Sequence, residues 1–203
     1  MTARARRKPQ PLATEFFDRD PRRVARELLG KLIVRRVGRQ TLIARVVETE
    51  AYLGKNDLAA HSSSGRTKRN EVIFGPPGHA YVYFIYGSHY CLNVSCMPDG
   101  VAGGVLFRAV EPIAGIEAMA QARALEVTEL HRLTNGPGKL TEALSITRAD
   151  NGMKLTDATQ SLYLAEDDFP KPRVKTTPRI GITKAADLKL RYLVVGNPFV
   201  SRA

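Results

Sequence analysis

The sequence has little of what marks membrane-spanning or disulfide-stabilised proteins. Its longest wholly apolar or aromatic run is the six residues Tyr81 to Tyr86, whereas a membrane-spanning helix needs about 20. Two cysteines, Cys91 and Cys96, are too few and too close for a disulfide framework. No apolar stretch of the kind found in a secretory leader precedes Glu15. We therefore expect no membrane association and a reducing compartment.

Metal-ligand patterns are equally sparse. None of the four histidines pairs with another histidine, a cysteine or a carboxylate at a spacing typical of zinc sites. The segment Gly136-Pro137-Gly138-Lys139 resembles part of a phosphate-binding loop but lacks the full pattern, so we interpret it as a turn before a helix. The sequence therefore predicts neither a metal site nor a cofactor.

Size and charge narrow the class of protein. A chain of 203 residues with 43% hydrophobic and 25% charged residues is typical of one globular domain. The formal net charge of +11 is uneven: residues 1–80 carry +9, residues 81–170 carry −5 and residues 171–203 carry +7. If the two ends meet in the fold, they form a positive face that attracts polyanions, nucleic acid foremost. The alternatives are an anionic membrane or ribosomal surface, or solubility alone.

The chain divides into a short arm and one folded domain. Residues 1–14 are basic and lack apolar periodicity, so we expect a flexible arm, followed by a single domain over 15–203. Helices are predicted at 20–30, where Asp20-Pro21 is a typical start, and at 113–125 and 139–144. Strands are predicted at 31–37, 41–53, 81–86, 89–96, 105–110, 162–164, 174–182 and 190–195. This predicts a mixed α/β domain with a curled, largely antiparallel sheet and flanking helices.

One predicted strand begins apolar and ends with two carboxylates. Glu48, Glu50 and Tyr52 alternate along it and so share one face. An ionised carboxylate on an apolar face is costly unless it is paired or used in chemistry. One interpretation is a structural ion pair with an arginine. The other is catalysis, because two strand rises separate the glutamates by about 6.6 Å, which also fits a two-carboxylate glycosidase.

An aromatic residue stands at the end of the predicted hairpin. Tyr86 directly precedes Gly87-Ser88, a pair typical of a tight two-residue turn. A side chain at this position packs against little of its own core. It would therefore either insert into a DNA base step or fold back onto a neighbouring loop.

Nine short motifs follow one another in an order that resembles a known family. They are Phe16-Phe17-Asp18, Leu28-Leu29-Gly30, Val47-Glu48-Thr49-Glu50-Ala51-Tyr52-Leu53-Gly54, Ala59-Ala60-His61-Ser62, Tyr81-Val82-Tyr83, Ile85-Tyr86-Gly87, Cys91-Leu92-Asn93, Arg108-Ala109-Val110-Glu111-Pro112 and Gly136-Pro137. From about Phe16 to the C-terminus they closely resemble the alkyladenine DNA glycosylases, also called the 3-methyladenine DNA glycosylase family. The resemblance implies a single mixed α/β domain with a protruding β-hairpin. It also implies metal-independent hydrolysis of the N-glycosidic bond of alkylated or deaminated purines in DNA.

The same resemblance implies roles for individual residues. Glu50 matches the carboxylate that orients and deprotonates the attacking water. Arg108 matches a residue that helps to hold that water or a nearby phosphate. Tyr52, His61 and Tyr83 match the walls of the pocket that receives the flipped base.

Two hairpin positions complete the implied site. Asn93 resembles the residue that obstructs the exocyclic amino group of normal guanine, and Tyr86 matches the wedge that fills the vacated base stack. After the wedge, Ser88 and His89 replace a larger apolar or aromatic pair of the family. A two-residue turn would pair position 82 with position 93 and place Asn93 on the face opposite Tyr83. A bulge or strong curl would then be needed to bring both into one pocket.

The leading hypothesis is a monofunctional DNA glycosylase that acts as a monomer on double-stranded DNA containing damaged purines. The implied lesions are 3-methyladenine, 7-methylguanine, hypoxanthine and ethenoadenine. We expect a location in the bacterial cytoplasm, or in the nucleus of a eukaryote. The alternatives are a non-catalytic nucleic-acid-binding protein on the same scaffold and a metal nuclease that uses Glu48 and Glu50.

Overall fold

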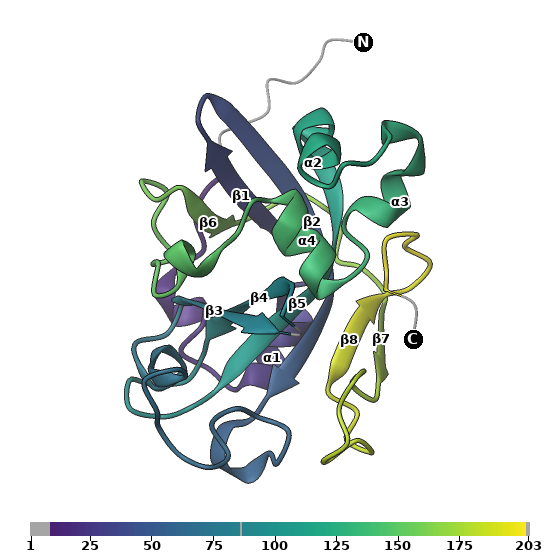
Figure 1. Ribbon diagram of the computed structural model, residues 1–203. Coiled ribbons are helices and arrows are strands. Elements are labelled where there is room, and N and C mark those ends of the chain that lie inside the picture. The colour runs from purple at the N-terminus through teal and green to yellow at the C-terminus, as the bar shows by residue number, and fades with distance from the viewer. Residues whose placement is uncertain (1–8, 86, 202–203) are drawn as a thin grey trace.

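An antiparallel sheet organises the computed structural model, which describes residues 9–85 and 87–201 (Figure 1). Within these residues the strands are β1 (Leu32–Val37), β2 (Gln40–Tyr52), β3 (Ala80–Ile85), β4 (His89–Ser95), β5 (Gly104–Ala114), β6 (Leu162–Ala165), β7 (Val174–Thr177) and β8 (Arg191–Val194). The α-helices of the same residues are α1 (Pro21–Glu27), α2 (Ile116–Ala122), α3 (Leu130–Leu133) and α4 (Pro137–Ala143). The predicted single mixed α/β domain with an antiparallel sheet is confirmed, and the sheet is not closed into a barrel.

The long strand β2 is the centre of this sheet. The strand order is β3-β4-β5-β2-β1-β6, with β8 paired to β2 and β7 to β8. β5 runs along one side of β2, while on the other side β1 pairs with the first half of β2 and β8 with Glu48 to Glu50. The segment that carries both glutamates therefore lies between two strands.

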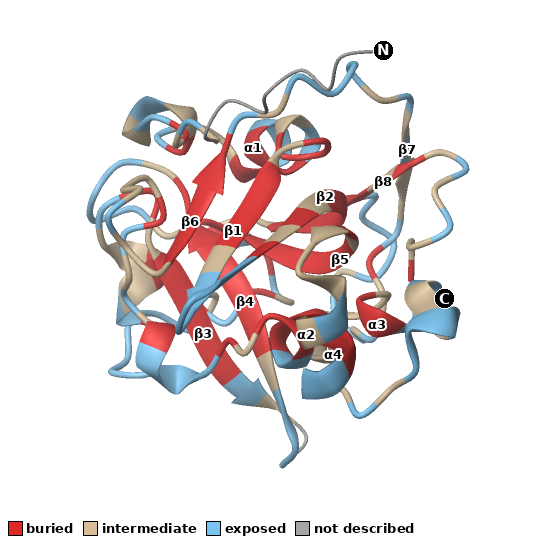
Figure 2. Cartoon of the chain, turned by 90° about the horizontal axis from the view of Figure 1, so that it is seen from above, coloured by how far each residue is buried: buried red, intermediate tan, exposed pale blue. Residues whose placement is uncertain are grey.

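Helices cover both faces of the sheet. Figure 2 shows α1 on one face and α2 and α4 on the other. The Thr49 hydroxyl donates to the Ala25 carbonyl of α1 at 2.8 Å, and because side chains alternate along a strand, Glu48 and Glu50 face away from α1. The apolar core includes Phe17, Val24, Leu28, Phe107, Met119 and Leu140. Among the helices of the described residues, none has the length and hydrophobicity required to cross a bilayer.

The predicted start of the first helix agrees with the structure, whereas the predicted start of the second does not. At α1 the Asp20 carboxylate accepts the Arg22 backbone N–H at 2.8 Å, and Pro21 is the first helical residue. α2 begins later than predicted, after Gly115, because residues 113 and 114 still belong to β5. The left-handed φ of Gly115, +75°, marks this change from strand to helix.

The predicted arm contains residues that belong to the folded domain. Residues 1–8 of the arm lie outside the described residues. Pro11 forms a β-bridge with Ala165, and the Leu12 N–H donates to the Leu164 carbonyl at 2.9 Å. The Leu12 side chain is 2% exposed, so burial of this single leucine attaches the segment to β6.

The β3–β4 hairpin differs in register from the prediction. Ile85 lies opposite His89, so residues 86–88 connect the strands, and the predicted two-residue turn is wrong. Gly87 has a φ of +67°, the left-handed conformation that a three-residue hairpin loop requires at one position. Figure 2 shows the exposed end of this hairpin projecting beyond α4. Tyr86, the predicted wedge, lies outside the described residues.

The corrected register brings the pocket candidates to one face. Tyr81 lies opposite Asn93, and Tyr83 lies opposite Cys91. Directly opposed residues of an antiparallel pair share a face. All four side chains therefore point the same way without the predicted bulge or curl.

We expect Gly54→Ala to destabilise the fold strongly, because Gly54 follows β2 at a φ of +82° and an added Cβ would lie 2.2 Å from the Ala102 carbonyl oxygen. The combined strain and overpacking cost at least about 2 kcal/mol. Gly38 also has a positive φ, +57°, but an added Cβ there meets open space, so Gly38→Ala costs only about 1 kcal/mol. Urea unfolding of both variants tests the difference, and equal losses would contradict it.

Candidate active site

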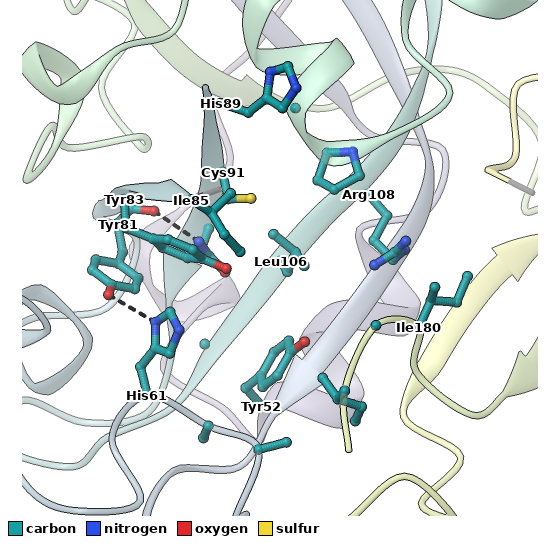
Figure 3. A pocket seen from close by; sticks show the side chains of 18 of the residues that line it. Tyr52, His61, Tyr81, Tyr83, Ile85, His89, Cys91, Leu106, Arg108 and Ile180 are labelled. Carbon is teal, nitrogen blue, oxygen red and sulfur yellow. Dashed lines mark hydrogen bonds between the residues drawn. The ribbon is translucent and has the colours of Figure 1, made fainter. Parts of the chain in front are cut away.

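A cavity of about 500 Å³ lies on the face of β2 that points away from α1. Its walls come from Tyr52 at the end of β2, residues 59–62, the β3–β4 hairpin, β5, residues 136–139 and residues 180–182. Figure 3 shows Tyr52, His61 and Tyr83 facing this cavity from three different segments. A concave, largely apolar site with a few convergent polar groups is typical of a ligand-binding pocket.

An aromatic cluster forms one side of the cavity. The His61 ring packs edge-on against Tyr83 with centroids 4.5 Å apart, and Tyr81 lies 5.2 Å from Tyr83. The His61 Nδ1 and the Tyr81 hydroxyl form a hydrogen bond of 3.1 Å. Burial lowers the pKa of the His61 imidazole, and the charge of Arg69 lowers it further. The cluster therefore presents neutral rings at neutral pH.

The orientation of Asn93 is fixed by its own hairpin. Its Nδ2 donates to the Tyr81 carbonyl at 3.1 Å, and the residue is 8% exposed. This hydrogen bond uses one of the two amide hydrogens and restricts rotation of the side chain. Asn93 lines the same cavity as Tyr83, as the corrected register requires.

Glu48 is a fully buried carboxylate with four hydrogen-bond donors among the described residues. It accepts the Nε–H of Arg108 at 3.0 Å and of Arg191 at 2.6 Å. The N–H and hydroxyl of Ser201 donate to it at 2.6 Å and 2.8 Å. Three of these donors share Oε1, and the Ser201 N–H donates to Oε2. Glu48 therefore forms a structural ion pair with Arg108 and Arg191, which is one of the two interpretations that the sequence left open for the glutamates.

Glu50 has fewer donors and lies against the cavity. Its Oε1 accepts the Ile180 N–H at 2.8 Å and lies 3.2 Å from Nη1 of Arg108, while its Oε2 accepts the Tyr52 hydroxyl at 3.0 Å. Glu50 is fully buried, but all three partners line the cavity. The carboxylate therefore lies directly behind the cavity wall.

Burial raises the pKa of Glu50 above its ordinary value. The Arg108 charge, the Ile180 N–H and the Tyr52 hydroxyl oppose this rise, and the neighbouring charge of Glu48 adds to it. A carboxylate whose pKa lies closer to neutrality is a stronger proton acceptor. Glu50 therefore has the properties of a general base beside a pocket.

Arg108 connects the two glutamates. It lies on β5 where the pairing with β2 shifts register around Glu48, and its side chain reaches the cavity wall. Burial lowers the pKa of Arg108, but the charges of Glu50 and Glu48 outweigh this and raise it overall. The guanidinium therefore remains charged between the two carboxylates.

The structure thus brings six sequence-predicted residues to one place, and their roles remain predictions. They are Glu50, Tyr52, His61, Tyr83, Asn93 and Arg108. Sequence analysis did not identify Tyr81 or Ile180 as part of the site. The alternation of Tyr81 with Tyr83 is a signal that could have found the first. Ile180 falls within the strand predicted at 174–182, but β7 ends at Thr177, so the prediction is wrong beyond that residue and Ile180 lies in a segment without helix or strand. Strand periodicity could not show that its N–H group reaches Glu50.

Comparison with known proteins identifies the family. The family model described as methylpurine-DNA glycosylase matches residues 15–198. The chain belongs to the methylpurine-DNA glycosylase family. This confirms the resemblance that the nine motifs indicate.

The matches between this methylpurine-DNA glycosylase family member and its relatives span nearly the whole length of both chains. A Koribacter versatilis protein named "Putative 3-methyladenine DNA glycosylase" is 60% identical over 192 residues, which are 94% of this chain and 93% of that protein. Proteins of the same name from Methanocella arvoryzae and Alkaliphilus oremlandii are 47% and 43% identical. They match over 194 and 201 residues, 94% of this chain in both cases and 96% and 98% of their own lengths.

The burial of Glu48 and its two guanidinium partners predict a large stability effect in this member of the methylpurine-DNA glycosylases. Glu48→Gln keeps the shape but leaves the guanidiniums of Arg108 and Arg191 without their shared counter-charge, so we expect a loss of about 3–5 kcal/mol. Glu27→Gln is the control, because the Glu27 side chain is 38% exposed and pairs with Arg19 and Arg23 near the surface, where the loss of an ion pair costs about 1 kcal/mol or less. Equal unfolding free energies for the two variants would contradict the assignment.

Proposed function

We propose that this chain is a monofunctional DNA glycosylase that removes alkylated or deaminated purines from double-stranded DNA and so initiates base excision repair. The proposed substrate class is that of 3-methyladenine, 7-methylguanine, hypoxanthine and ethenoadenine. The observation that carries the proposal is the buried Glu50 carboxylate directly behind the wall of an aromatic cavity. Family membership and the names of its relatives support it.

The cavity suits a purine that has left the duplex. Chemistry at the bond between base and sugar requires eversion of the nucleotide, which costs a few kcal/mol and least for a damaged base. Stacking on aromatic rings returns about 1–3 kcal/mol per base. Tyr52, His61 and Tyr83 offer such rings around one cavity. A purine alkylated at N3 or N7 is cationic, and the ring faces attract it further.

Glu50 is the proposed base that activates water. Among the described residues, the Tyr52 hydroxyl is the donor to its Oε2, and a carboxylate oxygen has a second acceptor site. A water bound there attacks C1′ of the deoxyribose while Glu50 accepts its proton. The bond from C1′ to the purine breaks with its electron pair on the base, so a cationic purine leaves as a neutral molecule. The carboxylate charge also stabilises the developing oxocarbenium ion.

Arg108 and Asn93 take the supporting roles. Arg108 lines the cavity with its Nε held by Glu48, so a fixed positive group is available to orient the water or a flanking phosphate. Asn93 is held by the Tyr81 carbonyl and cannot easily move away from an incoming base. We propose that it obstructs the exocyclic amino group of normal guanine.

The DNA itself is recognised by charge and by the hairpin. The net charge of +11 favours binding to the phosphate backbone. Tyr86 is the proposed wedge in the vacated base stack, and in the sequence it directly follows Ile85, the last residue of β3. We propose that the protein acts as a monomer without a metal ion or another cofactor.

Glu50→Gln should abolish base release while sparing binding to a lesion-containing duplex, because the amide cannot accept a proton from water. Release of free 3-methyladenine and formation of an abasic site are measured in chelator-containing buffer under single-turnover conditions. Glu27→Gln, at the surface of α1, serves as the control and should retain the wild-type rate.

The alternatives predict other outcomes. A non-catalytic DNA-binding protein would release no base even as wild type. A metal nuclease would cleave the strand directly and lose activity with chelator. Either result would refute the proposed glycosylase reaction.

The pH dependence of excision follows from the same carboxylate. Burial raises the pKa of Glu50 above 4.5, and only its ionised form accepts a proton. The rate on a cationic lesion should therefore rise with pH through a midpoint above 4.5. Single-turnover rates measured from acid to neutral pH give this rise, which we call the acid limb of the pH–rate profile. If the acid limb is unchanged in His61→Gln, it belongs to the carboxyl group and not to the imidazole. A rate that stays constant down to pH 4.5 would contradict the assignment.

A further inference from the structure

A segment without helix or strand supplies part of the site. Residues 178–190 connect β7 to β8. Within them the Ile180 N–H donates to Glu50 at 2.8 Å, and residues 180–182 line the cavity. A hydrogen bond to a catalytic group must be held within a fraction of an ångström, which irregular backbone does not ensure by itself. Some other interaction has to fix this segment.

A buried ion pair immediately beside Ile180 provides that anchor. The Arg179 guanidinium pairs with the Asp57 carboxylate through two hydrogen bonds, Nη1 to Oδ2 at 2.6 Å and Nη2 to Oδ1 at 2.8 Å. Both side chains are 0% exposed. Nη1 also donates to the Ala51 carbonyl at 3.1 Å, between Glu50 and Tyr52 on β2. The planar two-bond arrangement fixes orientation as well as distance.

The same guanidinium supports the Tyr52 ring. Its Cζ lies 4.6 Å from the ring centroid, a distance typical of a cation–π contact. Arg179 does not line the cavity, whereas Tyr52 does. The guanidinium therefore covers the ring from its protein side and leaves the cavity side to a ligand.

Asp57 extends the connection to a third wall. Its carboxylate accepts the Leu53 N–H and the Ala59 N–H, both at 3.1 Å. These bonds shape the turn that leads from β2 to residues 59–62, which include His61. The pair thus joins three cavity walls that are separate in sequence: the end of β2, residues 59–62 and residues 180–182.

We propose that Arg179 and Asp57 are positioning residues for excision, which together hold the Tyr52 ring against the everted base and the Ile180 N–H on Glu50. This inference rests on the proposed glycosylase function and deepens it. Neither side chain contacts the reacting atoms. They act through Tyr52 and Ile180.

The chain contains a matched ion pair away from the cavity. Arg35 donates to Asp150 at 2.6 Å and to the Ser145 carbonyl at 2.9 Å, and Asp150 also accepts the Thr147 N–H. Arg35 and Arg179 each have a buried Nε that has no hydrogen-bond partner among the described residues. None of these residues lines the cavity. The Arg35–Asp150 pair therefore controls for the loss of a buried arginine–aspartate interaction as such.

The test compares Arg179→Lys with Arg35→Lys, since both keep the positive charge and lose the guanidinium's hydrogen bonds to an aspartate and to a backbone carbonyl. We expect Arg179→Lys to lower the single-turnover excision rate roughly 10²-fold without weakening duplex binding. Among the described residues, the charged and titratable groups that face Glu50 are Arg108, Glu48, Tyr52, Cys91 and Arg179. All of them keep their charge in this variant. The Ile180 N–H lowers the pKa of Glu50, so loss of this hydrogen bond should raise that pKa and move the acid limb of the pH–rate profile to higher pH. Arg35→Lys should keep the wild-type excision rate and the wild-type position of the acid limb.

The possible outcomes separate a positioning role from a structural one. A folded Arg179→Lys protein with the wild-type excision rate and the wild-type acid limb would overturn the inference. An equal loss of excision rate in Arg35→Lys would also overturn it. If Arg179→Lys does not fold, Asp57→Asn against Asp150→Asn repeats the rate comparison with the same criterion. Failure of the wild-type protein to release base refutes the proposed function instead, so the two failures are distinguishable.

Discussion

One guanidinium, that of Arg108, lies between two neighbouring carboxylates whose other partners differ. Arg108 places Nε on Glu48 and Nη1 beside Glu50, because a buried carboxylate without a counter-charge costs several kcal/mol. Glu48 gains a second guanidinium from Arg191 and two donors from Ser201. Glu50 has only neutral donors besides Arg108, so its pKa stays raised. Two identical residues on one strand face thus become a carboxylate paired with two guanidiniums in the interior and a carboxylate beside a cavity that pairs with one.

The topology of the sheet places these partners. β2 pairs with β1 along its first half and with β8 along Glu48 to Glu50. That exchange delivers Arg191 of β8 to Glu48 and leaves the β7–β8 connection beside Glu50. The corrected hairpin register turns Tyr83 and Asn93 toward the same cavity. The site therefore depends on long-range strand pairing more than on any single motif.

The sequence predicted local features well and long-range partners poorly. The Asp20-Pro21 start of α1 and the alternation along β2 follow from backbone chemistry and could be read directly. The prediction of a two-residue hairpin turn was wrong because Gly87-Ser88 fits either a two-residue turn or part of a three-residue turn. The spacing of Glu48 and Glu50 could not assign their roles, because the deciding donors, Arg191, Ser201 and Ile180, are 130 or more residues away. The motif resemblance supplied the family and the candidate residues, but not these contacts.

The central claim is that Glu50 meets an everted purine nucleotide across the Tyr52 wall of the cavity. The most direct measurement is a crystal structure of the Glu50→Gln protein bound to a duplex with one ethenoadenine. The account predicts the lesion base inside the cavity against Tyr52 and the His61–Tyr83 rings, with C1′ facing the side chain at position 50 and a water between them. A base that remains stacked in the duplex, or a C1′ directed away from position 50, would contradict it.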